Sequence, residues 1–230
     1  MPPIGFSTGS LAFGNFRLGL QMVEGQRAAA IELSALREGE LVDLVSAIDE
    51  LELDQFSYIA VHAPSKLERL TEEFVVDQLK KVAHRGWPIV LHPDVVRVAE
   101  LWRPFGGLLC IENMDIRKST GRTTNELNDI FEILPEASLC FDIGHARQVD
   151  PTMSEAELIL KTFQRRIRQV HVSSVGSKSN HEPLNFGATR AFQRVAHLLP
   201  ADTPIILETP VLREQLHEEI LAARDALCVG

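Results

Sequence analysis

The chain has 230 residues, of which 45% are hydrophobic and 24% charged, and this composition excludes disordered and collagen-like proteins. It contains 23 Lys and Arg against 32 Asp and Glu, so its formal net charge is -9. An acidic protein repels a phosphate backbone unless a local basic patch outweighs the overall charge. Nucleic acid is therefore disfavoured as a partner without being excluded.

Three cysteines are too few for a disulfide framework in a chain of this length. Cys110 and Cys140 lie inside apolar runs, which is typical of buried free thiols and indicates a reducing, cytoplasmic compartment. No apolar stretch approaches the roughly 18 residues that a membrane span needs, and residues 1–10 lack the pattern of a signal peptide. We therefore expect a soluble, cytoplasmic protein without membrane contact.

Eight short runs rich in Val, Ile, Leu and Phe predict strands. Their continuous apolar character is typical of parallel strands that are buried on both faces. In chain order the runs cover residues 3–7, 29–33, 58–63, 88–92, 108–112, 138–142, 169–172 and 204–208.

Each run is followed by a polar loop and a segment with apolar residues at three- and four-residue spacing, which predicts a helix. Among the starts, Asn15 and Ser154 are N-cap types, and Thr71 and Thr123 each precede an acidic first turn. The predicted helices cover residues 16–26, 39–51, 71–84, 95–102, 125–134, 154–165, 188–198 and 212–227.

Eight alternating units of about 29 residues favour a closed (β/α)8 TIM barrel over an open doubly wound sheet, which alternation alone does not exclude. The chain has no linker, low-complexity tract or shift in composition. We therefore expect residues 1–230 to form a single, compact barrel domain with short loops.

The active site of such a barrel is built at the C-terminal ends of its strands. Six of the eight predicted strands end in, or just before, an imidazole or a carboxylate. These residues are His62, His92, Glu112, Asp142 with His145, His171 and Glu208.

One such residue is most often a loop anchor, but their number on one face points to a shared ligand. His84, His197 and His217 lie on predicted helices, whereas the other five histidines fall on the ligand-binding face. Converging carboxylates and buried imidazoles need cations between them. Mixed His and carboxylate ligands suit Zn, Mn or Fe better than Mg or Ca, and more than four ligands favour two or more ions. Glu112 could bridge two ions with its two oxygens.

The strand-end residues resemble those of the xylose isomerase-like barrel superfamily, in the branch that contains endonuclease IV. The resemblance extends from IGFSTGS at residues 4–10 to PIILETP at residues 204–210 and rests on strand-end motifs. It implies that one metal is held by His62, His92 and Glu112. It implies a second metal on Glu112, Asp142, His171 and Glu208.

A third metal of that branch uses the His of an Asp-x-x-His motif and an Asp-x-His pair after strand 7. His145 and His181 match the two histidines, but Ser179 occupies the Asp position. The resemblance therefore implies two or three divalent transition metals, with zinc favoured and manganese or iron as alternatives. Sugar isomerases and epimerases of the superfamily use the Glu, Asp, His, Glu set without a need for His62 and His92.

The function favoured by these residues is metal-assisted hydrolysis of a phosphoester in a small substrate. Glu112 and Glu208 would orient ligands or the nucleophile. Arg37, Arg147 and Lys178 lie in predicted loops on the same face and could hold a phosphate.

Three alternatives remain at this point. A sugar or sugar-phosphate isomerase or epimerase would use Glu112 and Glu208 as acid and base around one metal. An abasic-site DNA endonuclease fits the ligand set, but the short units and the acidic composition argue against it. A non-catalytic, metal-holding barrel is suggested only by Ser179.

Overall fold

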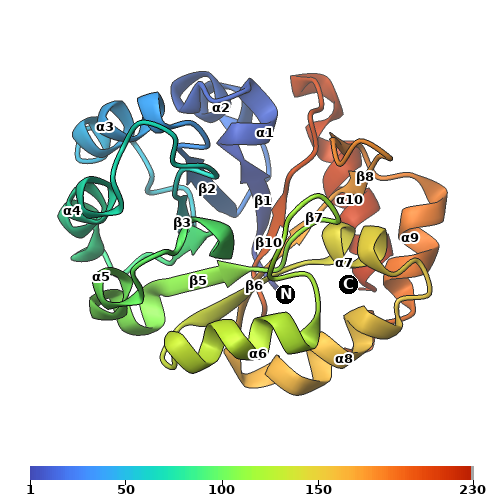
Figure 1. Ribbon diagram of the computed structural model, residues 1–230. Helices are drawn as coiled ribbons and strands as arrows, with labels where there is room; N and C mark the ends of the chain where they lie inside the picture. The colour runs from blue at the N-terminus through green and yellow to red at the C-terminus, as the bar shows by residue number, and fades with distance from the viewer. Residues whose placement is uncertain (229–230) are drawn as a thin grey trace.

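The computed structural model describes residues 1–228, and its eight main strands form a closed, parallel barrel (Figure 1). Because β1 pairs with both β2 and β10, the open-sheet alternative is excluded. The strands are β1 (Ile4–Ser7), β2 (Ala30–Ser34), β3 (Tyr58–His62), β4 (Ile89–Leu91), β5 (Leu109–Glu112), β6 (Ser138–Asp142), β7 (Ile167–Val172) and β10 (Ile205–Leu207). All eight predicted strands are present, and their ends differ by at most two residues from the prediction.

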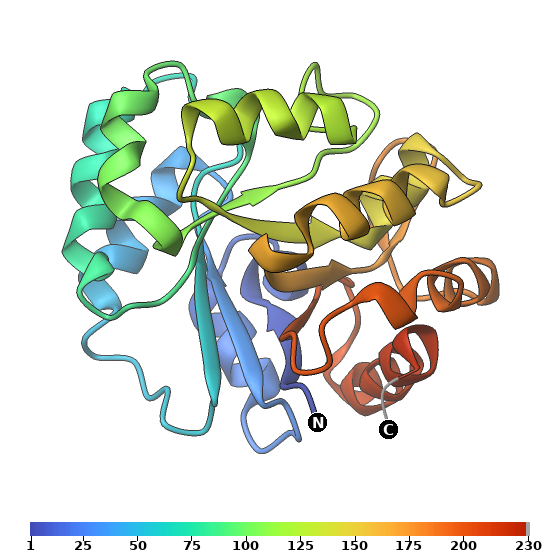
Figure 2. The same cartoon turned by 90° about the horizontal axis from the view of Figure 1, so that it is seen from below.

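Helices surround the strands in both views (Figures 1 and 2), so the barrel is covered on its outside. In the predicted segment 95–102 only the last four residues form an α-helix. Segments 188–198 and 212–227 are each divided into a helix and a 3-10 turn. The eight helices at the predicted places are α2 (Phe16–Val23), α3 (Glu38–Ala47), α4 (Glu72–Ala83), α5 (Ala99–Trp102), α6 (Thr124–Ile133), α8 (Ser154–Phe163), α9 (Phe186–Gln193) and α10 (Leu216–Leu227).

Three short elements lie in connections that were not assigned a structure. Helix α1 (Thr8–Ala12) follows β1, and helix α7 (Ile143–Val149) begins directly after β6. The connection after β7 contains a small antiparallel hairpin of β8 (Ser174–Val175) and β9 (His181–Glu182). All three follow the C-terminal end of a barrel strand, which is where ligands bind in this fold.

Three of the four predicted helix starts are capped as expected. Side-chain oxygens of Asn15, Thr71 and Thr123 accept hydrogen bonds from backbone N–H groups in the first turns of α2, α4 and α6. The assignment of Ser154 as an N-cap is wrong, because Ser154 is the first helical residue of α8. The Asp150 carboxylate takes over the capping role by accepting a hydrogen bond from the N–H of Glu155 (2.9 Å).

Two carboxylates hold the connections that follow β3 and β4. Glu38 accepts hydrogen bonds from the N–H groups of residues 68–70 at 2.7 to 3.0 Å. Buried Glu72 accepts from the N–H groups of Arg97 and Val98 and from Trp102 Nε1 (2.8 Å). These bonds satisfy loop N–H groups that would otherwise lack partners, and they fix the backbone that follows His62 and His92.

The predicted free thiols Cys110 and Cys140 are buried, and they pack with Val90 on neighbouring strands. Among the helices of residues 1–228, none has the length and apolar character that a bilayer span requires.

Candidate metal centre

The C-terminal ends of the barrel strands bring the predicted ligands into one cluster. His62, Glu112 and Asp142 are the last residues of β3, β5 and β6, and His171 is the fifth of six residues in β7. The other four predicted ligands are His92 after β4, His145 in the first turn of α7, His181 in β9 and Glu208 after β10.

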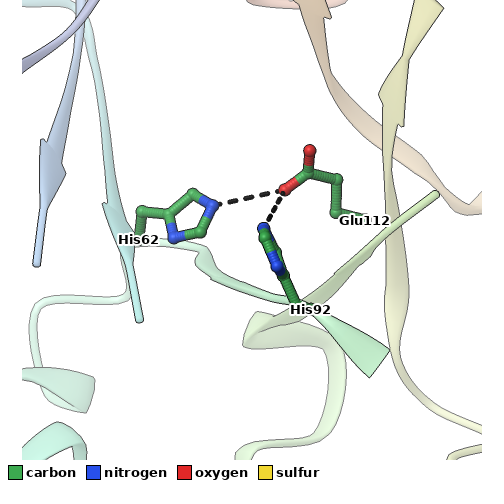
Figure 3. A group of neighbouring side chains, drawn as sticks. All are labelled: His62, His92 and Glu112. Carbon is green, nitrogen blue, oxygen red and sulfur yellow. Dashed lines mark hydrogen bonds and ion pairs between the residues drawn. The ribbon is translucent and has the colours of Figure 1, made fainter. Parts of the chain in front are cut away.

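The first group consists of His62, His92 and Glu112 (Figure 3). The Nε2 atoms of His62 and His92 lie 3.2 and 3.3 Å from the same oxygen, Oε2 of Glu112. His62 Nδ1 lies 2.7 Å from the carbonyl oxygen of Ala63. If Nδ1–H donates to this carbonyl, the Nε2 lone pair of His62 points toward Glu112, as metal binding requires.

The second group consists of Glu112, Asp142, His171 and Glu208, and all four residues are buried. His171 Nδ1 lies 3.3 Å from Glu208 Oε2 and 3.6 Å from Glu112 Oε1. Asp142 Oδ2, His171 Nδ1 and Glu208 Oε2 are all buried without a hydrogen-bond partner. Three unsatisfied polar atoms that converge in a buried space are costly, and a cation between them would remove that cost.

Glu112 belongs to both groups, and its two oxygens face in different directions. Oε2 faces His62 and His92, whereas Oε1 lies 3.3 Å from His145 Nδ1 and 3.6 Å from His171 Nδ1. This is the arrangement of a carboxylate that bridges two ions.

The third group contains Asp142, His145 and His181. Ser179, at the position where the resemblance would place an Asp, donates a hydrogen bond from its Oγ to Gln148 Oε1 (2.9 Å). Asp142 Oδ1 accepts from the N–H of His145 (2.6 Å), which leaves Oδ2 to face the group. Asp142 could therefore complete the third group in place of the carboxylate that residue 179 lacks.

Spacing and chemistry of the donors both fit transition metals. Bonds of about 2.1 Å at tetrahedral angles place neighbouring ligand atoms about 3.4 Å apart. The oxygens of Glu112 and Glu208 lie 3.2 to 3.6 Å from the nearest nitrogens of His62, His92 and His171. Imidazole nitrogens mixed with carboxylate oxygens match zinc, manganese or iron, while an all-oxygen shell would suit magnesium or calcium.

Asn113, which the sequence analysis did not select, holds the second group in position. Its side chain donates to the carbonyl oxygen of Asp142 (2.8 Å) and accepts from the N–H of the same residue (2.7 Å). These two bonds connect the ends of β5 and β6 and set the distance between Glu112 and Asp142. No periodicity or spacing in the sequence distinguishes this Asn from a loop residue.

Carboxylates and imidazoles in the cluster stabilise one another's charged forms. Burial lowers the pKa of His62, but Glu112 and further carboxylates raise that pKa to about 9. Burial also opposes the charge on His145, and Asp142 and Glu112 raise its pKa to about 10. Burial raises the pKa of Glu112, yet the surrounding histidines hold it well below its ordinary value. Without metal, protons on the histidines therefore balance the carboxylates.

A pH dependence follows for chelator-treated protein. Histidines with raised pKa values stabilise the fold fully below pH 6.5, and this contribution is lost as the pH rises through 9 to 10. We expect the melting temperature of metal-free protein to fall by roughly 5 °C or more between pH 6.5 and 9.5. Zinc-saturated protein is the control. Its histidines are already deprotonated, so its melting temperature should fall much less over the same pH range. Equal losses with and without zinc would contradict the assignment of the raised pKa values.

The three predicted phosphate-binding residues lie on this face but differ in their surroundings. Arg37, whose side chain is 73% exposed, contacts Glu40 and the carbonyl oxygen of Phe13. The prediction that Arg147 lies in a loop is wrong, because it lies in helix α7. Lys178 lies exposed between β8 and β9.

Lys118 is a further cation that the sequence analysis missed. Its Nζ pairs with Asp94 Oδ2 at 2.6 Å, and its side chain is only 14% exposed. Burial lowers the pKa of His92, and the charge of nearby Lys118 lowers it further. Lys118 thus places a positive charge near the first group.

Solved structures with the same fold cover nearly the whole chain. Endonuclease IV from Thermus thermophilus is 21% identical, covers 100% of both chains and has a TM-score of 0.60. A putative sugar phosphate isomerase/epimerase from Anabaena variabilis is 11% identical, covers 99% of both chains and has a TM-score of 0.70. A xylose isomerase-like TIM barrel protein from Mycobacterium smegmatis, solved in complex with magnesium, is 12% identical over 99% of this chain and 98% of that one, with a TM-score of 0.60.

No family model matches the sequence, and no curated protein matches it either. The likeness is therefore one of fold: this chain has the fold of the xylose isomerase-like barrels, including that of endonuclease IV.

Proposed function

From this shared fold and the buried ligand cluster, we propose that the protein is a metal-dependent enzyme that hydrolyses a phosphoester in a small substrate. The observation that carries the proposal is Glu112, whose two oxygens face two different groups of ligands. A bridging carboxylate would hold two ions close enough together to act on one phosphoryl group. Two ions, or three with the Asp142 group, would occupy the centre, and zinc is the preferred ion.

Bound divalent ions would neutralise phosphoryl oxygens and make hydroxide available near neutral pH. The inner part of the cluster is buried, since the side chains of His62 and Glu112 are each 1% exposed. His181 is 28% exposed and His92 13%, so these two histidines border the open side of the cluster. A substrate reaching the cluster from solvent would meet them first.

Basic residues in the connections on this face support a negatively charged substrate. Because these connections all follow C-terminal strand ends, their charges surround the mouth of the barrel. They are Arg37, Lys66, Arg69, Arg97, Arg117, Lys118, Arg122, Arg147, Lys178 and Arg213. The whole chain has a formal net charge of -9, which favours a small anion over a long polyanion.

A second candidate is isomerisation or epimerisation of a sugar or sugar phosphate. The observation that favours it is the second group, which offers four ligands without any need for His62 or His92. Glu112 and Glu208 would then lie on the two sides of a substrate as acid and base.

Hydrolysis and epimerisation are separated by assays on zinc-loaded and on chelated protein. Zinc-loaded protein is expected to release phosphate or alcohol from small phosphoesters, and chelation should reduce this rate by at least about 100-fold. Addition of zinc should restore it. Solvent-proton exchange at a sugar carbon without phosphoester cleavage would establish the second candidate instead. Absence of both activities over a broad substrate panel would count against an enzyme.

A further inference from the structure

Glu32 is a buried carboxylate in β2 that the predicted ligand set does not include. Its side chain is 0% exposed and lies inside the barrel, beneath the metal-ligand cluster. Oε2 of Glu32 lies 2.9 Å from His171 Nε2, whereas Oε1 has no hydrogen-bond partner. Burial of a carboxylate in an apolar strand destabilises the fold unless hydrogen-bond or charged partners compensate for the lost hydration.

His171 is contacted on both of its nitrogens by acidic groups. Nε2 faces Glu32, and Nδ1 faces Glu208 Oε2 and Glu112 Oε1 at 3.3 and 3.6 Å. A histidine that binds a metal through one nitrogen usually donates the proton on its other nitrogen to a carboxylate or carbonyl. Glu32 stands where such an acceptor is needed.

Gln169 holds the accepting oxygen in place from the neighbouring position on the same face of β7. Its Nε2 donates to Glu32 Oε2 (2.7 Å), and its Oε1 accepts from Tyr58 Oη (2.7 Å). Burial raises the pKa of Tyr58, so its hydroxyl is a donor at neutral pH. Tyr58 therefore orients the amide of Gln169. The amide nitrogen also lies 2.8 Å from His171 Nε2, and it can donate to that atom only in the tautomer that lacks a proton on Nε2. In the tautomer with a proton on Nε2, both nitrogens donate to Glu32 Oε2 instead.

We propose that Glu32 is a positioning residue that accepts the proton of His171 Nε2 and thereby directs the Nδ1 lone pair to the ion held with Glu112, Asp142 and Glu208. The inference rests on the metal centre of the proposed function. It assigns Glu32 to the orientation of a ligand, outside the set of ligands itself.

An additional ion between Glu32, His62 and Glu208 is the competing explanation, because these residues also lie close enough to share one. Both nitrogens of His62 are already engaged, however. Nε2 faces Glu112 at 3.2 Å and Nδ1 lies 2.7 Å from the carbonyl oxygen of Ala63. A ring nitrogen serves only one ion, so His62 has no atom left for such a site.

The test is zinc binding to chelated full-length protein, measured by competition with a chromophoric chelator. We expect Glu32→Leu to raise the zinc dissociation constant of the second group, which contains His171, by roughly 10- to 100-fold. Glu32→Gln keeps an oxygen that can accept from Nε2–H, so its loss should be smaller. Glu132→Leu is the matched control, because it makes the same chemical change at an exposed position of the outer helix α6. It should bind zinc within about threefold of wild type.

The tautomer of His171 is a second readout that a purely structural role would not change. In zinc-loaded wild type, 15N NMR should show the proton on Nε2 and coordination through Nδ1. Glu32→Leu should lose this single tautomer while its melting temperature still reports a folded barrel. Unchanged zinc affinity and an unchanged tautomer in Glu32→Leu would overturn the inference alone. Failure of wild-type protein to bind zinc would overturn it together with the proposed function.

Discussion

Glu112→Gln is expected to remove at least two bound ions and to reduce any metal-dependent activity by about 1000-fold or more. The physical reason is that the change neutralises the one carboxylate whose oxygens face His62, His92, His145 and His171 at 3.2 to 3.6 Å. Loss of an outer-sphere partner costs a metal site roughly 10- to 100-fold, and loss of a ligand shared by two ions should exceed this. Metal content per chain and hydrolysis rate measure the two effects.

Glu182→Gln is the matched control for Glu112→Gln. It makes the same chemical change in an exposed residue of β9, on the same face of the barrel. Its metal content and rate should equal those of wild type. A Glu112→Gln protein that retains the wild-type number of ions would refute the assignment of Glu112 as a bridging ligand.

His92→Ala should separate the two candidate functions. It removes one of three residues of the first group and leaves the second group complete. We expect the loss of one ion and a fall in phosphoester hydrolysis of at least about 100-fold, because two-ion displacement needs both ions. An isomerase that uses only the second group would retain most of its activity.

His217→Ala is the control for the removal of a histidine, since His217 is exposed on α10 and belongs to none of the ligand groups. It should leave metal content and rate unchanged. If His92→Ala also left metal content and hydrolysis unchanged, the first group would have no part in catalysis.

The strands and most ligands could be predicted because two simple regularities act together. Strands buried on both faces must be apolar throughout, and a parallel barrel collects its strand ends on one face. His62, Glu112 and Asp142 therefore stand at the point where an apolar run ends, and the fold brings them together. His145 was found through its spacing from Asp142, which the structure explains: Asp142 caps helix α7 and His145 lies in its first turn.

Glu32 was missed because it interrupts an apolar strand in its middle, and Gln169 because it stands at the start of its predicted strand; a polar residue carries no signal of a site at either position. Their meaning depends on contacts between β2 and β7, which are 137 residues apart in sequence. Ser154 was assigned as a cap because Ser is favoured there, but it is the first residue of the helix, and Asp150, four residues earlier, accepts from the N–H of Glu155. The sequence also did not indicate which carboxylate could replace the one missing at residue 179. In the folded chain Asp142 lies beside His145 and His181 and forms the third group with them.

The claim that most needs a direct test is that the converging ligands hold more than one ion. Anomalous diffraction at the zinc edge, from crystals of zinc-loaded protein, measures this. Our account predicts one peak between His62, His92 and Glu112 and a second between Glu112, Asp142, His171 and Glu208. A single peak, or none at these positions, would contradict it.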